Sequence, residues 1–157
     1  MGDIFYSWSN YSIDVFRLCD SIKKKLRSTN KKVFKVFGVS RGGLVPAVSM
    51  SHILNTDFGS IDVQFRDREK KINLLPLQDA IFDCRGEEVI IVVDDIVDSG
   101  KTFERINSLV CLYETEVWYY SLIKSQNCKV DIDVTYAAWT DAGSWVVFPW
   151  EVDELTR

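Results

Sequence analysis

Residues 88–103 read E-V-I-I-V-V-D-D-I-V-D-S-G-K-T-F. Residues 89–93 form an unbroken apolar, largely β-branched run, a pattern typical of a strand buried on both faces of a parallel sheet. We therefore place this strand at the centre of the sheet. At its carboxyl end the sequence turns to acids, hydroxyls and a helix that begins near Thr102. Ligands of α/β proteins bind at the carboxyl ends of parallel strands, so this position indicates a binding site.

The two halves of this stretch suit different parts of a ligand. Asp94, Asp95 and Asp98 crowd three carboxylates together, and like charges this close repel unless a cation, a sugar or a metal ion compensates them. The second half consists of Ser99, Gly100, Lys101 and Thr102. It supplies hydroxyls, a cation, a glycine and the N–H groups of a helix start. Such a loop binds anions. The predicted ligand is a phosphorylated sugar.

Two other interpretations explain less of the stretch. A single aspartate here would be an ordinary turn former or helix cap, but that does not account for the whole run. A triphosphate-binding P-loop needs a glycine five residues before Gly100, and Asp95 stands there.

The sequence V-V-D-D-I-V-D-S-G-K-T, residues 92–102, resembles the phosphoribosyl-pyrophosphate (PRPP) signature of type I phosphoribosyltransferases. The resemblance implies an α/β fold in which helices flank a central parallel sheet that carries a small hood. It implies that Asp94 and Asp95 hold the ribose hydroxyls, Asp95 through Mg²⁺. It also implies that residues 99–102 bind the 5′-phosphate, and that Asp98 takes the proton at purine N7.

A second anion loop follows a second predicted strand, residues 33–39, and precedes a predicted helix, residues 44–54. The loop consists of Ser40, Arg41, Gly42 and Gly43. Two glycines permit a tight turn with exposed N–H groups, and the arginine adds a fixed cation. S-R-G-G-L-V-P resembles the pyrophosphate loop of purine phosphoribosyltransferases, especially the short bacterial xanthine-guanine type. The resemblance implies pyrophosphate binding here and a Ser40–Arg41 peptide bond that can be cis.

The base site is implied by the resemblance of the last third of the chain. Residues 143–151, G-S-W-V-V-F-P-W-E, are similar to the W-x-x-x-P-W-[DE] segment of the same family. By this resemblance Lys124 donates to the 6-oxygen of the purine, Trp145 stacks on the base and Val146 offers backbone groups to its edge. We expect Phe148 and Trp150 to be core filler. The hood is expected mainly in residues 139–157.

The rest of the chain is predicted from its spacing. We expect a helix over residues 9–26 capped by Ser9 or Ser12, because apolar residues recur there at helical spacing. Further predicted elements are a strand over 58–65, a helix over 103–113, and strands over 117–123 and 130–138. In the family a flexible loop closes over the reacting sugar, and residues 66–71 with 73–80 occupy its place.

Composition limits the class of protein. The 157 residues are 46% hydrophobic and are predicted to form one domain, residues 1–157. A net charge of −4 argues against nucleic-acid and membrane-surface partners, and without a signal peptide or an apolar span a cytoplasmic location is expected. Four scattered cysteines and one histidine make a zinc site improbable.

The sequence-level conclusion is an enzyme that transfers phosphoribose from PRPP to N9 of guanine, xanthine or hypoxanthine with Mg²⁺. Its relatives commonly form dimers or tetramers, so a homo-oligomer is expected. One alternative is a regulator with this fold that binds PRPP or a nucleotide without efficient turnover. Another is a phosphate-accepting receiver domain, which would have its acid pair after the first strand and would leave residues 40–43 and 99–102 unexplained.

Overall fold

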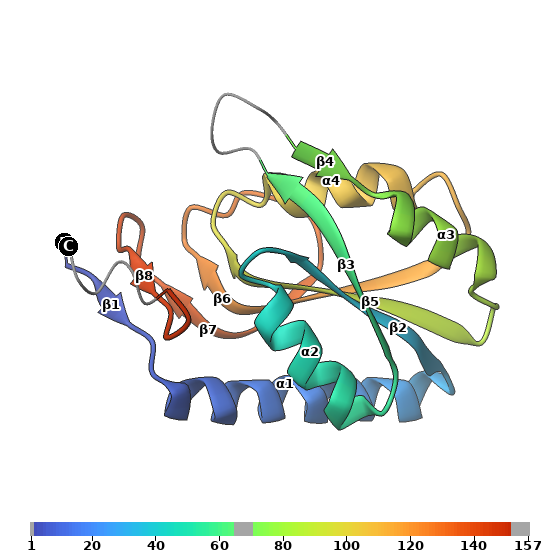
Figure 1. The fold of residues 1–157 in the computed structure, drawn as a ribbon, viewed down its shortest axis with the longest axis horizontal. Coiled ribbons are helices and arrows are strands. Elements are labelled where there is room, and N and C mark those ends of the chain that lie inside the picture. The colour runs from blue at the N-terminus through green and yellow to red at the C-terminus, as the bar shows by residue number, and fades with distance from the viewer. Residues whose placement is uncertain (1, 65–70, 152–157) are drawn as a thin grey trace.

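The computed structural model describes residues 2–64 and 71–151 (Figure 1). The described elements are, in chain order, β1 (Ile4–Phe5), α1 (Trp8–Thr29), β2 (Lys32–Ser40), α2 (Leu44–Leu54), β3 (Asp57–Gln64), β4 (Lys71–Asn73), α3 (Leu75–Asp83), β5 (Glu88–Val97), α4 (Lys101–Val110), β6 (Glu116–Ser125), β7 (Val134–Thr140) and β8 (Val146–Val147). None of the described helices is long and apolar enough to cross a membrane.

The main sheet has the strand order β4-β3-β2-β5-β6-β7. Neighbouring strands are parallel except for β4, which runs antiparallel to β3 at one edge. The central position predicted for residues 89–93 is confirmed, since β5 lies between β2 and β6 and these five residues are 0% exposed. Two-sided burial explains why this strand is apolar without alternation.

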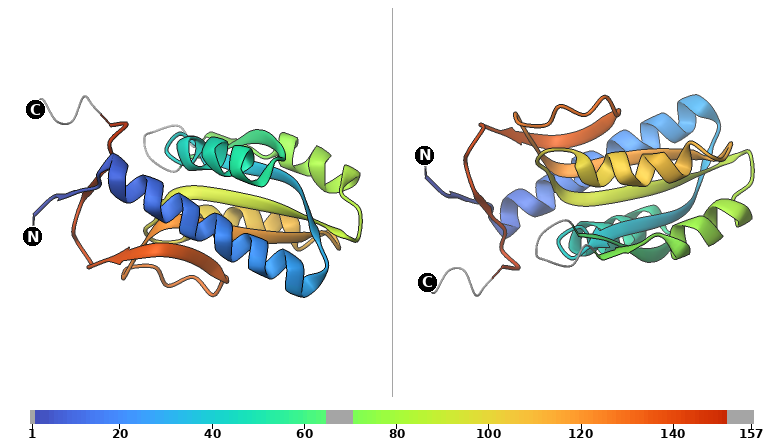
Figure 2. Two further views of the ribbon diagram at one scale, coloured as in Figure 1. Left: turned by 90° about the horizontal axis from the view of Figure 1, so that it is seen from below. Right: turned by 90° about the horizontal axis from the view of Figure 1, so that it is seen from above.

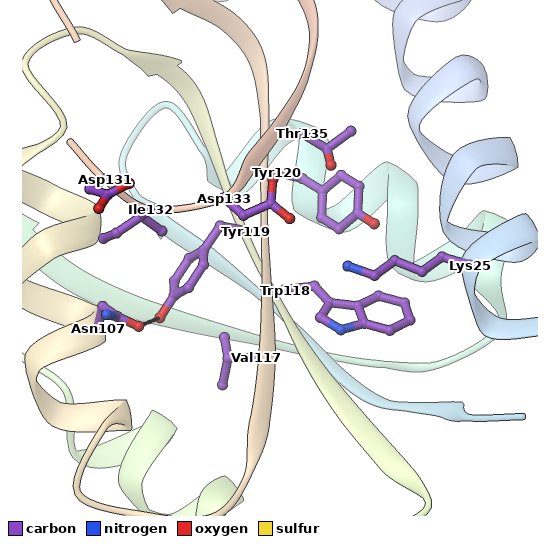
Figure 3. A pocket seen from close by; sticks show the side chains of 10 residues that line it. All are labelled: Lys25, Asn107, Val117, Trp118, Tyr119, Tyr120, Asp131, Ile132, Asp133 and Thr135. Atoms are coloured by element: carbon purple, nitrogen blue, oxygen red, sulfur yellow. Dashed lines mark hydrogen bonds between the residues drawn. The ribbon is translucent and has the colours of Figure 1, made fainter. Parts of the chain in front are cut away.

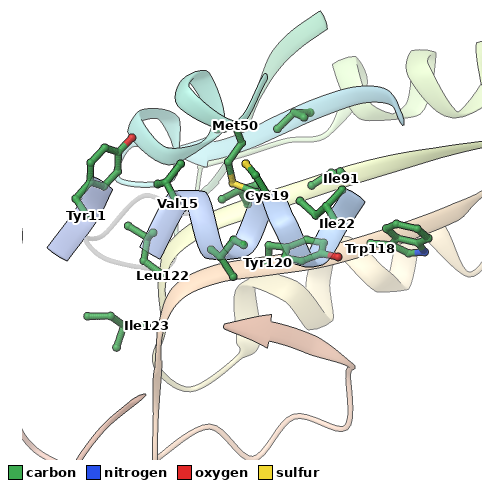
Figure 4. Packing of buried hydrophobic residues seen from close by; sticks show 14 of the residues in the cluster. Tyr11, Val15, Cys19, Ile22, Met50, Ile91, Trp118, Tyr120, Leu122 and Ile123 are labelled. Atoms are coloured by element: carbon green, nitrogen blue, oxygen red, sulfur yellow. The ribbon is translucent and has the colours of Figure 1, made fainter. Parts of the chain in front are cut away.

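Helices cover both faces of the sheet (Figures 1 and 2). Val89, Ile91 and Val93 of β5 pack in one core cluster with residues of α1 and α2 (Figure 4). Ile90 and Val92 pack in the other, with residues of α3 and α4. Because strand side chains alternate between faces, one strand supplies both cores, and the predicted α/β architecture is confirmed.

A separate two-stranded sheet pairs β1 with β8 in parallel, with Ile4 opposite Val146 and Phe5 opposite Val147. Figure 1 shows it at the end of the molecule where β5 runs into the acidic stretch. The sequence had placed the hood mainly in residues 139–157 and had not joined the amino terminus to it. Residues 152–157 lie outside the described part.

The cap predicted for the first helix is wrong. α1 begins at Trp8, and the side chain of Ser7 accepts from the Asn10 backbone N–H at 3.1 Å. Ser12 lies inside the helix, where its hydroxyl donates to the Trp8 carbonyl at 3.0 Å. Ser7 has the extended backbone that a cap requires. The helix extends beyond the predicted residues 9–26 by one residue at its start and three at its end.

The loop predicted over 73–80 is also corrected. Asn73 ends β4, and α3 covers residues 75–83 with Leu77 and Ile81 buried against the sheet. Pro76 lies in its first turn, where a missing N–H costs nothing. Residues 65–70, with Arg66 and Arg68, lie outside the described part of the chain. β7 begins at Val134, later than the predicted 130, and α4 ends at Val110, earlier than the predicted 113.

Candidate active site

The two predicted anion loops meet at one edge of the sheet. They follow β2 and β5, which are neighbouring parallel strands with Gly38 opposite Val93. A side chain at Gly42 would overlap the carboxylate of Asp95. A Cβ at Gly43 would lie 2.5 Å from the Val93 carbonyl oxygen and 2.9 Å from Asp94 Cα. The loop at residues 40–43 is therefore in contact with the acidic end of β5, and only glycine permits this approach.

Asp94 and Asp95 lie near the carboxyl end of β5 and are linked to each other. The Asp95 N–H donates to Asp94 Oδ1 at 3.0 Å, and the Ile96 N–H donates to Asp95 Oδ1 at 2.8 Å. Burial raises the pKa of the Asp95 carboxyl and the carboxylate of Glu151 adds to the rise, while hydrogen bonds of this carboxyl with the Asp94 side chain and the Ile96 N–H oppose it. No ion pair of the described part of the chain includes Asp95. A half-buried carboxylate in this setting gains from a cationic or hydroxyl-bearing ligand.

The donor set at this edge suits magnesium held partly by a substrate. Among the residues described, no group of three or more histidine, cysteine, aspartate or glutamate side chains could hold a metal ion. Magnesium, however, is commonly bound through one or two carboxylates together with substrate phosphates and water. Asp95, whose carboxylate oxygens lie against Gly42 of the neighbouring loop, fits that mode.

Two helices begin at this edge without a side-chain cap. α4 starts after Gly100, whose φ of 84° is in the left-handed region that favours glycine, and α2 starts after Gly43. A side chain at Gly100 would overlap Val130, so the loop after β5 is packed against the segment that precedes β7. Asp98, Ser99 and Lys101 beside it are exposed. Uncapped first-turn N–H groups with exposed polar side chains can bind phosphate.

The Ser40–Arg41 peptide bond is cis, as predicted for the second loop. The Gly43 N–H donates to the Val39 carbonyl at 3.0 Å and the Leu44 N–H to the Arg41 carbonyl at 3.1 Å. The Arg41 side chain is exposed. It is therefore accessible to an anion bound in the loop.

Lys124 lies at the end of β6 in a setting that the sequence did not predict. It is half-buried, stands opposite Trp139 of β7, and its Nζ lies 5.4 Å from the ring centroid of Tyr136. A cavity of about 210 Å³ is lined by Lys124, Ser125, Gln126, Cys128, Tyr136 and Trp139. Trp145, which is 45% exposed, is not part of that lining. The structure thus places two further aromatic side chains beside the lysine.

The backbone of Val146 faces away from β1. The Ile4 N–H donates to the Trp145 carbonyl at 2.8 Å, and the Tyr6 N–H donates to the Val147 carbonyl at 2.9 Å. Along a strand the backbone groups of successive residues point to opposite edges, so those of Val146 point away from the strand that holds its neighbours. The pairing with β1 therefore does not use them.

The remaining aromatic residues of the tail are packed, as expected for core filler. Phe148 is 2% exposed and stacks on Trp150 with ring centroids 4.9 Å apart. Trp150 also contacts Trp8 and Tyr11 of α1. The Phe148 N–H donates to Glu151 Oε2 at 2.9 Å and closes the turn that follows.

A second cavity lies away from all of these residues. It has a volume of about 240 Å³, beside the amino-terminal half of β6, with Lys25 of α1 and Asn107 of α4 at its two sides (Figure 3). Lys25 Nζ lies 4.2 Å from the ring centroid of Trp118, and the Tyr119 hydroxyl donates to Asn107 Oδ1 at 3.1 Å. None of the residues predicted for the site lines it.

Comparison with known proteins gives consistent matches. Residues 7–156 match the family model described as "Phosphoribosyl transferase domain". A xanthine-guanine phosphoribosyltransferase of Cereibacter sphaeroides is 29% identical over 124 residues, which cover 74% of this chain and 68% of that protein. The crystal structure of a purine phosphoribosyltransferase from Pyrococcus horikoshii matches with a TM-score of 0.71 and 31% identity, over 96% of this chain and 95% of that one.

One similar protein has a different role. The transcriptional regulator GfcR of Methanococcoides burtonii is 32% identical over 108 residues, which cover 64% of this chain and 52% of that protein.

Proposed function

Because the chain belongs to the phosphoribosyl transferase domain family, we propose that it is a purine phosphoribosyltransferase. It transfers phosphoribose from PRPP to N9 of a 6-oxopurine base (guanine, xanthine or hypoxanthine) and releases pyrophosphate. The proposal is carried by the contact of Gly42 with the Asp95 carboxylate, because it joins the sugar-binding acids and the pyrophosphate loop in one site. The names of the relatives from Cereibacter sphaeroides and Pyrococcus horikoshii support a purine base.

The site accounts for both charges that develop in the displacement. A bond forms between purine N9 and ribose C1′ while the bond from C1′ to the pyrophosphate oxygen breaks, so the ring becomes positive and the leaving group negative. Asp94 and Asp95 hold the ribose hydroxyls beside the positive ring. Residues 99–102 bind the 5′-phosphate and residues 40–43 stabilise pyrophosphate. Mg²⁺ bound through Asp95 and PRPP oxygens would supply further positive charge to the leaving group.

Four residues are assigned to the purine base. Asp98 accepts the proton of purine N7 as N9 attacks. Lys124 donates to the 6-oxygen, and Val146 offers its backbone groups to the purine edge. Trp145 provides an aromatic face, which stacks on any purine without demanding particular donors.

A turnover assay tests the proposal directly. Purified protein is incubated with PRPP and Mg²⁺ and with guanine, xanthine, hypoxanthine or, as a control, adenine, and pyrophosphate and nucleoside 5′-monophosphate are measured. Formation of both products with a 6-oxopurine is expected. If no base gives product while PRPP still binds in a calorimetric titration, the enzyme proposal is wrong.

PRPP binding without product formation would favour a regulator. The similarity to GfcR is the observation that supports this alternative, in which PRPP or a nucleotide is bound as a signal.

We also propose that the chain forms a homo-oligomer, a dimer or a tetramer, and sedimentation equilibrium measures this separately from activity.

Replacing Trp145 by alanine is expected to weaken base binding by about 1–3 kcal/mol, the range for stacking of a base on an aromatic side chain. PRPP affinity should change little, because the residue lies in the hood. Titration calorimetry with base and with PRPP measures both constants. Trp139→Ala is the comparison, since Trp139 is 61% exposed and lines the Lys124 cavity. A larger loss of base affinity in Trp139→Ala would show that the base stacks on Trp139, beside Lys124, and not on Trp145.

A further inference from the structure

A buried hydrogen bond connects the amino-terminal segment to α1. The Tyr6 hydroxyl donates to Asp14 Oδ2 at 2.7 Å, and each residue is 6% exposed. The other carboxylate oxygen accepts from Arg17 at 3.3 Å, although Arg17 is largely exposed. Burial raises the pKa of Tyr6, and the hydrogen bond to Asp14 raises it further, so the phenol remains a donor. Neither side chain takes part in the reaction described above.

Tyr6 also contacts the segment that carries Trp145 and Val146. Its N–H donates to the Val147 carbonyl at 2.9 Å, and its ring packs edge-on against Phe148 with centroids 5.4 Å apart. Two residues earlier, the Ile4 N–H holds the Trp145 carbonyl. Of the residues proposed to contact the base, the two in the tail, Trp145 and Val146, are thus fixed through residues 4–6.

The small sheet needs such an anchor. β1 and β8 have two residues each, and an isolated two-stranded sheet is at best marginally stable in water. The stacked rings of Phe148 and Trp150 add stability and orient the segment that follows β8. A hydrogen bond of 2.7 Å between buried partners is directional and sets a position.

We propose that the Tyr6–Asp14 hydrogen bond is a positioning device for the purine base. It fixes β1 on α1. β1 in turn fixes Trp145 and Val146 in the position in which they contact the base. The assignment rests on the proposed function, since it presumes that these two residues bind the base. Tyr6 and Asp14 are positioning residues, and neither touches a substrate.

The test removes the bond with the smallest change. Tyr6→Phe deletes only the hydroxyl and keeps the ring on Phe148. Because a misplacement of about 1 Å can cost on the order of 100-fold, we expect the KM for the base to rise on the order of 10-fold, with the KM for PRPP within about two-fold. Asp14→Leu should give the same separation of the two constants. Asp14→Asn keeps an acceptor oxygen for Tyr6 and should restore near-normal KM for the base.

Tyr119→Phe is the matched control. Tyr119 is 5% exposed and its hydroxyl donates to Asn107 Oδ1 at 3.1 Å, so this variant also removes one hydroxyl from a buried tyrosine, but on the α4 side of the sheet. It should lose thermal stability without a change in the KM for the base. If Tyr6→Phe behaves in the same way, the Tyr6–Asp14 bond is merely structural and the proposal is overturned.

Amide hydrogen exchange of residues 145–148 separates this proposal from the proposed function. In Tyr6→Phe and Asp14→Leu these amides should exchange faster than in the wild type, while in Asp14→Asn and Tyr119→Phe they should not. A wild-type protein that turns over no purine would refute the proposed function, and the exchange result would then decide the positioning role alone. Unchanged exchange in Tyr6→Phe overturns it.

Discussion

Asp98→Asn is expected to lower turnover by about 10²–10⁴-fold, the usual loss when a general base is removed. Asp98 follows the last residue of β5 and is exposed, next to the loop proposed to bind the 5′-phosphate. Asparagine keeps the shape and the hydrogen bonds of the side chain but cannot accept the N7 proton. PRPP binding should survive, because Asp94 and Asp95 hold the ribose. Steady-state rates with each 6-oxopurine and calorimetric titration with PRPP and Mg²⁺ measure the two effects.

An exposed aspartate away from the site provides the control. Asp83 ends α3, and Asp83→Asn removes the same charge from the surface. It should leave turnover unchanged. Near-normal turnover in Asp98→Asn would show that proton removal needs no help from this carboxylate. Loss of PRPP binding would reassign Asp98 to the ribose-phosphate site.

The parts of the fold that could be predicted are those that contiguous sequence encodes. The apolar run in β5 can only be buried on both faces, and this places it at the centre of the sheet. The polar stretches at residues 40–43 and 94–102 lie at the carboxyl ends of β2 and β5. Two parallel neighbours end at the same edge, so the contact of Gly42 with Asp95 follows from their pairing.

The parts that escaped prediction depend on contacts between distant and short segments. β1 and β8 are two residues each and lie at opposite ends of the chain, so neither has enough residues to show a period. The bond between Tyr6 and Asp14 also escaped prediction, because no residue period marks a hydrogen bond between a short extended segment and the helix that follows it.

The surroundings of Lys124 were missed for a different reason. Sequence resemblance assigned Trp145 to the base, whereas Tyr136 and Trp139 line the cavity beside the lysine. The sequence alone did not mark these two residues, because their exposure on a strand at the sheet edge is seen only in the structure.

Gly42→Ala tests whether the contact between Gly42 and the Asp95 carboxylate carries the function. The added methyl group would overlap the Asp95 carboxylate, so one of the two must shift. A displacement of about 1 Å in a positioning group can cost on the order of 100-fold, and we expect kcat/KM for PRPP to fall by about that factor. The KM for the base should change little, because Trp145 and Val146 belong to the hood. Steady-state kinetics with each substrate varied in turn measures both.

Gly86→Ala is the control, because a Cβ at Gly86 meets no atom within 4 Å and this substitution should leave the kinetics unchanged. A double-mutant cycle identifies the cause of the loss. Asp95→Ala removes the group that the methyl overlaps, so Gly42→Ala should add little further loss on that background. If the two losses instead multiply, Gly42 acts through its own contacts with pyrophosphate. If Gly42→Ala alone keeps normal PRPP kinetics, sugar binding does not depend on the position of Asp95. The sugar-binding site would then be assigned to residues 98–102.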